Sequence, residues 1–191
     1  MKTDAFALLG LPRCASVSAE EVRDAFQKAA AAVHPDAAEN DEDRARRTEQ
    51  FAVLNEAHAI LTSLPRRLRH LLALQYPHTA AARTGAVMDS AMMELFSTVA
   101  ATVQRAAAVQ SKKQRAATAL TKAMLAGEEM EARESLESAV EKVEAAREAL
   151  EAALAEDDAD AETLQSCAAC AGFLEKWRTQ LRVAFAGFIG A

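Results

Sequence analysis

Two short segments of this 191-residue chain carry side chains of the kind that do chemistry. The first is the tripeptide His34-Pro35-Asp36, which places an imidazole and a carboxylate close together, as acid–base and metal sites often do. No other histidine or cysteine lies near it in the sequence, so it has neither further metal ligands nor a nucleophile to activate. We therefore interpret the tripeptide as a binding loop. Since no phosphate loop or nucleophile–base set occurs elsewhere, we expect no enzymatic activity and no cofactor.

The second segment is Cys167-x-x-Cys170, a spacing that can hold zinc or form a redox pair. It falls within a predicted helix, and the chain has no second pair to complete a four-ligand zinc site. We expect these cysteines to pack in the interior and to bind no metal. With Cys14 they make an odd total of three, which suits the reducing cytoplasm better than a disulfide framework.

Composition favours helices and excludes several other functions. Apolar residues make up 51 % of the chain, with alanine supplying much of that share, and glycine and proline are scarce, which favours an all-α fold. We see no convincing alternation of apolar and polar residues, as a half-buried strand would require. The net charge of −6 argues against nucleic acid as the main partner. We also expect neither a signal peptide nor a membrane span, because no window of about 18 apolar residues occurs.

Residues 1–76 are predicted to form helices that place the tripeptide in a connecting loop. A short helix capped by Asp4 is expected to stop at Gly10. A capping-box pattern at Ser18 and Glu21 begins the next helix, which the proline of the tripeptide would end. A third helix from about residue 41 would pack against it as an antiparallel pair, and a short helix follows residue 65. The apolar faces of the two long helices are Val22, Phe26, Ala29, Ala30 and Val33 on one, and Phe51, Leu54, Ala57 and Leu61 on the other.

After a predicted linker over residues 77–86, residues 87–191 are predicted to form a three-helix bundle. Its helices are expected over about 88–125, 128–155 and 161–188, with Gly127 stopping the first. The first helix carries Met92, Leu95, Phe96, Val99 and Val103 at helical spacing, which predicts a core-facing side. In the second helix, Leu136, Val143 and Leu150 recur every seven residues with Ala139, Ala146 and Ala153 between them, which predicts a close-packed seam. Trp177, Phe185 and Phe188 of the third are interpreted as core residues.

Charge is segregated between the first two helices of the predicted bundle. From Leu95 to Gly127 the chain has no acidic residue, whereas acidic residues dominate from Glu128 to Glu162. One interpretation is that a basic helix lies antiparallel to an acidic one and that their pairing helps to fix the register. The other interpretation is that the basic helix is a binding face for an acidic partner. The basic residues are Arg105, Lys112, Lys113, Arg115 and Lys122.

Residues 4–36 and 51–74 resemble a J-domain, the module that defines DnaJ-type co-chaperones. The matching features are the helix from Glu20 to Val33, the tripeptide, and the run Phe51-Ala52-Val53-Leu54-Asn55-Glu56-Ala57-His58. The HscB branch of that family, the co-chaperones of iron–sulfur cluster assembly, also ends in a three-helix bundle. Three segments are similar to HscB: Phe6-Ala7-Leu8-Leu9-Gly10-Leu11-Pro12, Leu61-Thr62-Ser63-Leu64-Pro65-Arg66-Arg67-Leu68-Arg69-His70-Leu71-Leu72, and Phe173-Leu174-Glu175-Lys176-Trp177.

This resemblance implies partners and roles for particular residues. The tripeptide would contact a DnaK- or HscA-type ATPase chaperone and stimulate ATP hydrolysis, with Asp36 pairing with an arginine of that chaperone. Arg23 and Lys28, on the helix before the tripeptide, would add positive charge to the same contact. In HscB the bundle binds the scaffold protein on which clusters are built. The positions here that fall on that surface are Met92, Met93, Glu94 and Phe173.

Two alternatives stay open. Family members usually have Lys or Arg after the tripeptide, where this chain has Ala37, and they display more basic residues on the preceding helix. A structural helical adaptor, whose J-like half does not activate a chaperone, would fit that departure. The bundle's first helix is basic where HscB is rich in glutamate on its scaffold-facing side. A J-domain protein with a different client would fit this second departure.

Overall fold

The computed structural model describes residues 3–78, 88–156 and 159–189. Within these ranges the chain forms seven α-helices and one short 3₁₀ helix, η1, and contains no strand, so the all-α prediction is confirmed. The chain divides into two compact units. Unit 1 comprises Met1–Ala86 and Glu151–Ala169, and unit 2 comprises Val87–Leu150 and Cys170–Ala191. Most of the predicted linker, residues 79–86, lies outside the described residues, and the predicted domain boundaries stay a prediction.

Unit 1 begins with three helices whose ends follow from local chemistry. α1 (Ala5–Leu9) starts where the carboxylate of Asp4 accepts the N–H groups of its first turn, and it ends at Gly10, whose φ of 67° is left-handed. α2 (Ala19–Ala32) has the predicted capping box, in which Ser18 and Glu21 satisfy each other's backbone N–H groups at 3.1 and 2.8 Å. α3 (Asp41–Thr62) is capped by the amide oxygen of Asn40.

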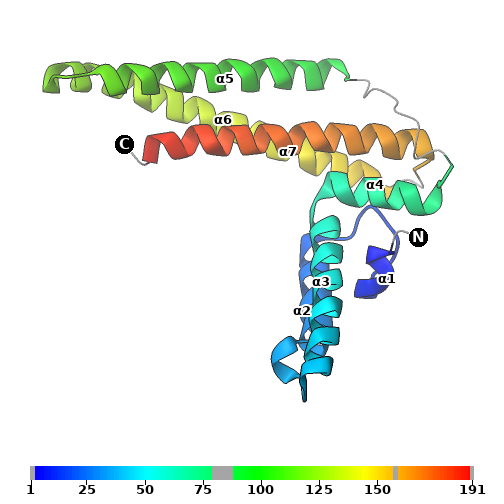
Figure 1. The fold of residues 1–191 in the computed structure, drawn as a ribbon. Coiled ribbons are helices and arrows are strands. Elements are labelled where there is room, and N and C mark those ends of the chain that lie inside the picture. Colours follow the sequence, from blue (N-terminus) through cyan, green and yellow to red (C-terminus); the bar gives the residue numbers. More distant parts are fainter. Residues whose placement is uncertain (1–2, 79–87, 157–158, 190–191) are drawn as a thin grey trace. The chain divides into compact units, whose positions relative to one another are not determined.

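α2 and α3 form the antiparallel pair expected from the sequence, and η1 (Pro35–Ala37) lies in the connection between them (Figure 1). α1 packs on the same hairpin, with Phe6 and Leu9 buried. α4 (Leu64–Gln75) follows directly after α3 and turns its leucines inward. The apolar core of unit 1 consists mainly of Phe6, Leu9, Val17, Val22, Leu54, Leu61, Leu64, Leu68, Leu71, Leu72, Leu154 and Leu164.

Two polar side chains are buried in α4 and tie it to its neighbours within unit 1. His70 accepts the backbone N–H of Ala5 through Nε2 at 3.0 Å, and its ring stacks on Phe6. Arg67 donates to the carbonyl of Leu61 at 3.0 Å and lies 3.7 Å from the carboxylate of Glu151. No sequence pattern predicts a role for His70, yet its ring nitrogen is the acceptor that holds the first turn of α1 to α4.

Unit 2 is built from the main parts of three long helices, α5 (Ser90–Arg115), α6 (Ala119–Glu156) and α7 (Ala161–Ile189), which lie side by side (Figure 1). Their shared core includes Val99, Ala106, Val109, Ala132, Leu136, Ala139, Val143, Leu174, Trp177, Leu181 and Phe188. Three helices and most of the predicted core positions are confirmed. The seam fades towards its end, where Leu150 is half-buried and Ala153 is exposed.

The predicted end of the first bundle helix is wrong. α5 ends at Arg115 and α6 begins at Ala119, so Gly127 lies inside α6 instead of stopping a helix. The break is made by Thr118, whose hydroxyl accepts the N–H of Thr121 at 3.2 Å, and by three basic residues that favour the carboxyl end of α5. A glycine in a helix interior costs only about 1 kcal/mol, which is too little to end a helix of 38 residues at Gly127.

The segregated charges pair across α5 and α6. Lys112 lies 2.6 Å from Glu128, Lys113 lies 3.1 Å from Glu129, and Arg105 is hydrogen-bonded to Glu131. The interpretation that a basic helix lies antiparallel to an acidic one is therefore confirmed. These pairs are mostly exposed, so each contributes at most about 1 kcal/mol and serves register more than stability.

Candidate functional site

The tripeptide lies in an exposed turn between α2 and α3. His34 caps η1, and its Nδ1 accepts the backbone N–H of Asp36 at 3.3 Å. Two further backbone hydrogen bonds close the loop: the N–H of Ala37 donates to the carbonyl of His34, and the N–H of Ala38 donates to the carbonyl of Pro35. The side chain of Asp36 is 91 % exposed, so its carboxylate is available to another molecule.

A cluster of rings supports the histidine from the side of the hairpin. The ring of His34 meets the ring of Phe51 edge-on, with centroids 5.6 Å apart. Phe51 packs against Phe26 of α2 at 6.4 Å, and Phe26 packs against His58 at 4.4 Å. Aromatic pairs of this kind contribute about 0.5–1.5 kcal/mol beyond the area they bury. The apolar faces predicted for α2 and α3 therefore reach the loop itself and set where the imidazole sits.

Positive charge near the loop is limited on α2. Arg23 and Lys28 are both exposed, as a contact with a partner would require. However, the guanidinium of Arg23 lies 3.8 Å from the carboxylate of Glu20 and 3.7 Å from that of Asp24, which offset its charge. Arg23 is also ten residues before Val33, or about 15 Å along the helix axis. The structure thus brings Lys28 closer to the tripeptide than Arg23.

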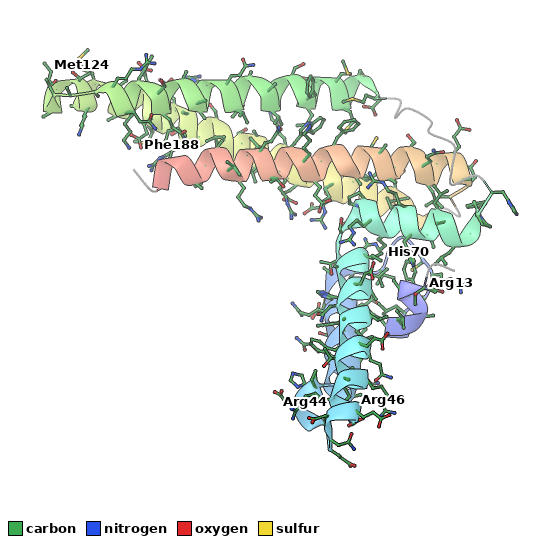
Figure 2. All side chains as sticks on the ribbon, viewed as in Figure 1. Arg13, Arg44, Arg46, His70, Met124 and Phe188 are labelled. Atoms are coloured by element: carbon green, nitrogen blue, oxygen red, sulfur yellow. The ribbon has the colours of Figure 1, made fainter. Side chains whose placement is uncertain are left out.

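Arginines gather instead at the start of α3, which adjoins the loop. Figure 2 shows Arg44 and Arg46 at this end of the helix. Arg46 and Arg47 both bind the carboxylate of Asp43, at 2.5 and 2.7 Å. Their hydrogen bonds, that of Arg47 above all, lower the pKa of Asp43 to about 2. Arg47 also donates to the carbonyl of Ala32, the last residue of α2, at 3.2 Å.

A second exposed surface lies in unit 2 and contains the positions expected to bind a client. Met93 and Phe173 are 51 % and 37 % exposed, Glu94 is exposed, and Met92 is half-buried. Phe96, predicted to face the core, is instead 48 % exposed, because this side of α5 is left uncovered in unit 2. The buried ring of Trp177 lies between the two phenylalanines, with centroids 5.9 Å from Phe96 and 6.0 Å from Phe173.

Other chemistry finds little support in the described residues. No group of three or more His, Cys, Asp or Glu side chains in residues 3–78, 88–156 and 159–189 is arranged to hold a metal ion. Cys14, Cys167 and Cys170 are partly buried thiols that form no disulfide, and burial raises the pKa of the Cys170 thiol. In the same part of the chain, no helix is long and apolar enough to cross a bilayer.

Comparison with known proteins identifies the part of the chain that carries the tripeptide. Residues 4–70 match the family model of the DnaJ domain. Residues 4–70 form a J-domain. Over 70 residues the chain is 41 % identical to an uncharacterized J domain-containing protein of Schizosaccharomyces pombe, and the match covers 37 % of this chain. It spans about a third of that protein, 32 % of its length.

Nearly the whole chain shares its fold with a solved structure. Chaperone HscB from Vibrio cholerae superposes with a TM-score of 0.60, covering 95 % of this chain and 96 % of that one. Sequence identity between the two is 21 %, so the likeness concerns the fold. The chain therefore carries a J-domain at residues 4–70 and has an HscB-like fold.

The contacts or exposure of several residues of these two surfaces were not predicted from the sequence. The ion pair of Asp43 and Arg47 could have been predicted, because an acidic and a basic residue four apart lie on one helix face. The contact of Arg47 with Ala32 could not have been predicted, because it joins residues 15 apart in the sequence across the hairpin. Helical spacing predicts a core position for Phe96 because it identifies an apolar face without telling what covers that face.

Proposed function

We propose that this protein is a J-domain co-chaperone that stimulates ATP hydrolysis by a DnaK- or HscA-type chaperone. The observation that carries the proposal is the tripeptide of the J-domain, presented on an exposed turn with Asp36 91 % exposed. The protein would act by binding and would perform no catalysis of its own. The odd number of free cysteines favours the reducing cytoplasm as its compartment.

The mechanism rests on a preorganised loop and one carboxylate. Pro35 fixes its own φ, and the ring of His34 is held by Phe51, so little conformational freedom is lost when the loop docks. The carboxylate of Asp36 would pair with an arginine of the chaperone. Because the co-chaperone can shift the chaperone's cycle only by binding one of its states more tightly, this pair would form in the hydrolysis-competent state.

The test is the steady-state ATPase rate of the chaperone with wild-type protein and with Asp36→Asn. Truncating one partner of an interfacial charge pair costs about 2–5 kcal/mol, so stimulation at a subsaturating concentration should fall by a factor of about 30 or more. Glu39→Gln is the matched control, since it removes an exposed negative charge three residues away. Absence of stimulation by the wild type would reject the proposal.

We further propose that unit 2 delivers a client, the scaffold protein of iron–sulfur cluster assembly. Exposed apolar side chains at Met93, Phe96 and Phe173 support a docking surface there, because such patches often mark interfaces. Met92 and Glu94 border the same patch. A pull-down of the scaffold with Phe173→Ala should lose binding, whereas Val183→Ala, also exposed on α7, should retain it. Equal capture by both variants would rule out this surface.

A second candidate function is a helical adaptor that holds a client without activating a chaperone. The partial neutralisation of Arg23 by Glu20 and Asp24, together with Ala37 after the tripeptide, favours a weak activator. This candidate predicts client binding without ATPase stimulation. A J-domain protein with another client predicts stimulation without scaffold binding, so the two assays together separate all three functions.

A further inference from the structure

The loop that presents the tripeptide has no core of its own. None of residues 33–40 is buried, and only short-range hydrogen bonds hold η1 together. Ordering a segment costs conformational entropy for every residue, and a loop without a fully buried residue has little to offset that cost. The ordered conformation must therefore be stabilised by residues outside the loop.

Arg47 and Asp43 of α3 connect the two ends of this loop. At one end, Nη1 of Arg47 donates to the carbonyl of Ala32, the last residue of α2, at 3.2 Å. Nε of Arg47 donates to Oδ2 of Asp43 at 2.7 Å, and that oxygen also accepts the backbone N–H of Glu39 at 3.4 Å. A continuous chain of contacts thus runs from the residue before the loop to one of its last residues.

The contact between Arg47 and Ala32 also satisfies a group that the end of α2 leaves unpaired. The carbonyl of Ala32 is one of the terminal carbonyls of α2, for which no intrahelical N–H is available. A guanidinium at that position also complements the negative end of the helix dipole. Arg47 and Asp43 are only 23 % and 13 % exposed in their side chains, so water competes weakly for these contacts.

We propose that Arg47 and Asp43 are positioning residues that hold the His34-Pro35-Asp36 loop in its binding conformation. This inference rests on the proposed function, since the loop's activity is what they would support. They touch no partner themselves. Arg47 reaches both α2 and Asp43 through the separate nitrogens of one planar group, which a lysine cannot reproduce. The low pKa of Asp43 keeps its carboxylate ionised throughout the physiological range, so its charge does not change there.

The experiment compares Arg47→Ala with Arg46→Ala in the full chain. Arg46 binds the same carboxylate at 2.5 Å but, within the described residues, forms no hydrogen bond to α2, so it is the matched control. Hydrogen exchange of residues 33–40 should speed up about tenfold in Arg47→Ala and stay near wild type in Arg46→Ala. Circular dichroism of both variants should show unchanged helix content. If Arg47→Ala loses helix content, Arg47→Lys replaces it and should show an intermediate gain in exchange.

Chaperone stimulation supplies the second readout. A loop that is ordered only part of the time binds in proportion to its ordered fraction. Arg47→Ala should therefore raise the concentration for half-maximal stimulation about tenfold while leaving the maximal stimulation intact. Asp43→Asn should behave alike, and the double variant Asp43→Asn/Arg47→Ala should be no worse than Arg47→Ala alone, because the two act as a unit.

The outcomes separate this inference from the function on which it rests. Equal loop exchange in Arg47→Ala and Arg46→Ala would overturn the positioning role even if the wild type stimulates strongly. Additive effects of the Asp43 and Arg47 substitutions on half-maximal stimulation would also overturn it. A wild type that fails to stimulate would reject the co-chaperone function, and loop exchange would still decide whether the two residues order the loop.

Discussion

Replacing His70 by leucine should destabilise the J-domain, because it removes the hydrogen-bond acceptor of the Ala5 N–H. The ring nitrogen Nε2 of His70 accepts the N–H of Ala5 at 3.0 Å, and Ala5 itself is only 1 % exposed. Leucine fits a buried helical position but offers no acceptor, so the N–H of Ala5 would stay buried without a partner. Leaving such a group unsatisfied costs about 1–3 kcal/mol.

Two smaller effects modify this estimate. The loss of the stacked contact with Phe6 adds about 0.5–1.5 kcal/mol, and the extra apolar burial of leucine returns about 0.8 kcal/mol per methylene group. These effects nearly cancel, so the lost acceptor decides the outcome, and we expect a net cost of about 2 kcal/mol. For a unit of this size that corresponds to a melting temperature lower by about 8–16 °C.

The assay is thermal unfolding by circular dichroism, combined with hydrogen exchange at α1. His70→Gln is the informative control, because its amide oxygen can reach the position of Nε2 and should recover much of the loss. His78→Leu is a second control, since His78 is exposed. Exchange should rise in Ala5–Leu9 for His70→Leu alone. Equal destabilisation by leucine and glutamine at position 70 would refute the acceptor role of His70.

Three further predictions concern other parts of the chain. The pKa of Asp43 is lowered to about 2 in the folded state, whereas in the unfolded chain it is about 3.9. The ion pairs of Asp43 therefore stabilise the protein fully at a pH above about 3.9, and this stabilisation is lost as the pH falls through 2. The urea midpoint should therefore fall more steeply between pH 4 and 2 in wild type than in Asp43→Asn, and parallel slopes would contradict this. Leu136 is fully buried, so Leu136→Ala should lower the free energy of unfolding by about 2–5 kcal/mol. Urea unfolding followed by Trp177 fluorescence measures this loss, and a loss below about 1 kcal/mol would contradict the place of Leu136 in the core. Gly127→Ala should raise stability by about 1 kcal/mol, since an added Cβ meets nothing within 4 Å; destabilisation would indicate a helix end there.

Local chemistry made the helix starts of unit 1 predictable. A cap such as Asp4, or the pair of Ser18 and Glu21, acts within four residues and can be recognised without knowing the fold. The tripeptide can be recognised in the same way, because its proline ends α2 through local backbone geometry alone. These signals sufficed to place the loop between two helices.

Two kinds of feature could not be predicted: a helix break with a weak local signal, and contacts between residues far apart in the sequence. The break between α5 and α6 has no glycine or proline, only Thr118 in an alanine-rich stretch, whereas Gly127 offered a false stop. The contact of Arg47 with Ala32 and the burial of His70 depend on which helices meet. Residues of this kind become visible only when the fold is known, because their partners lie far away in the sequence.

We propose that the carboxylate of Asp36 is the group through which the J-domain accelerates its chaperone. Single-turnover hydrolysis by a chaperone preloaded with ATP isolates that step from nucleotide exchange. Wild-type protein at saturating concentration should accelerate hydrolysis, and Asp36→Asn should return the rate to that of the chaperone alone while melting at the same temperature. Equal acceleration by the two proteins would contradict the claim.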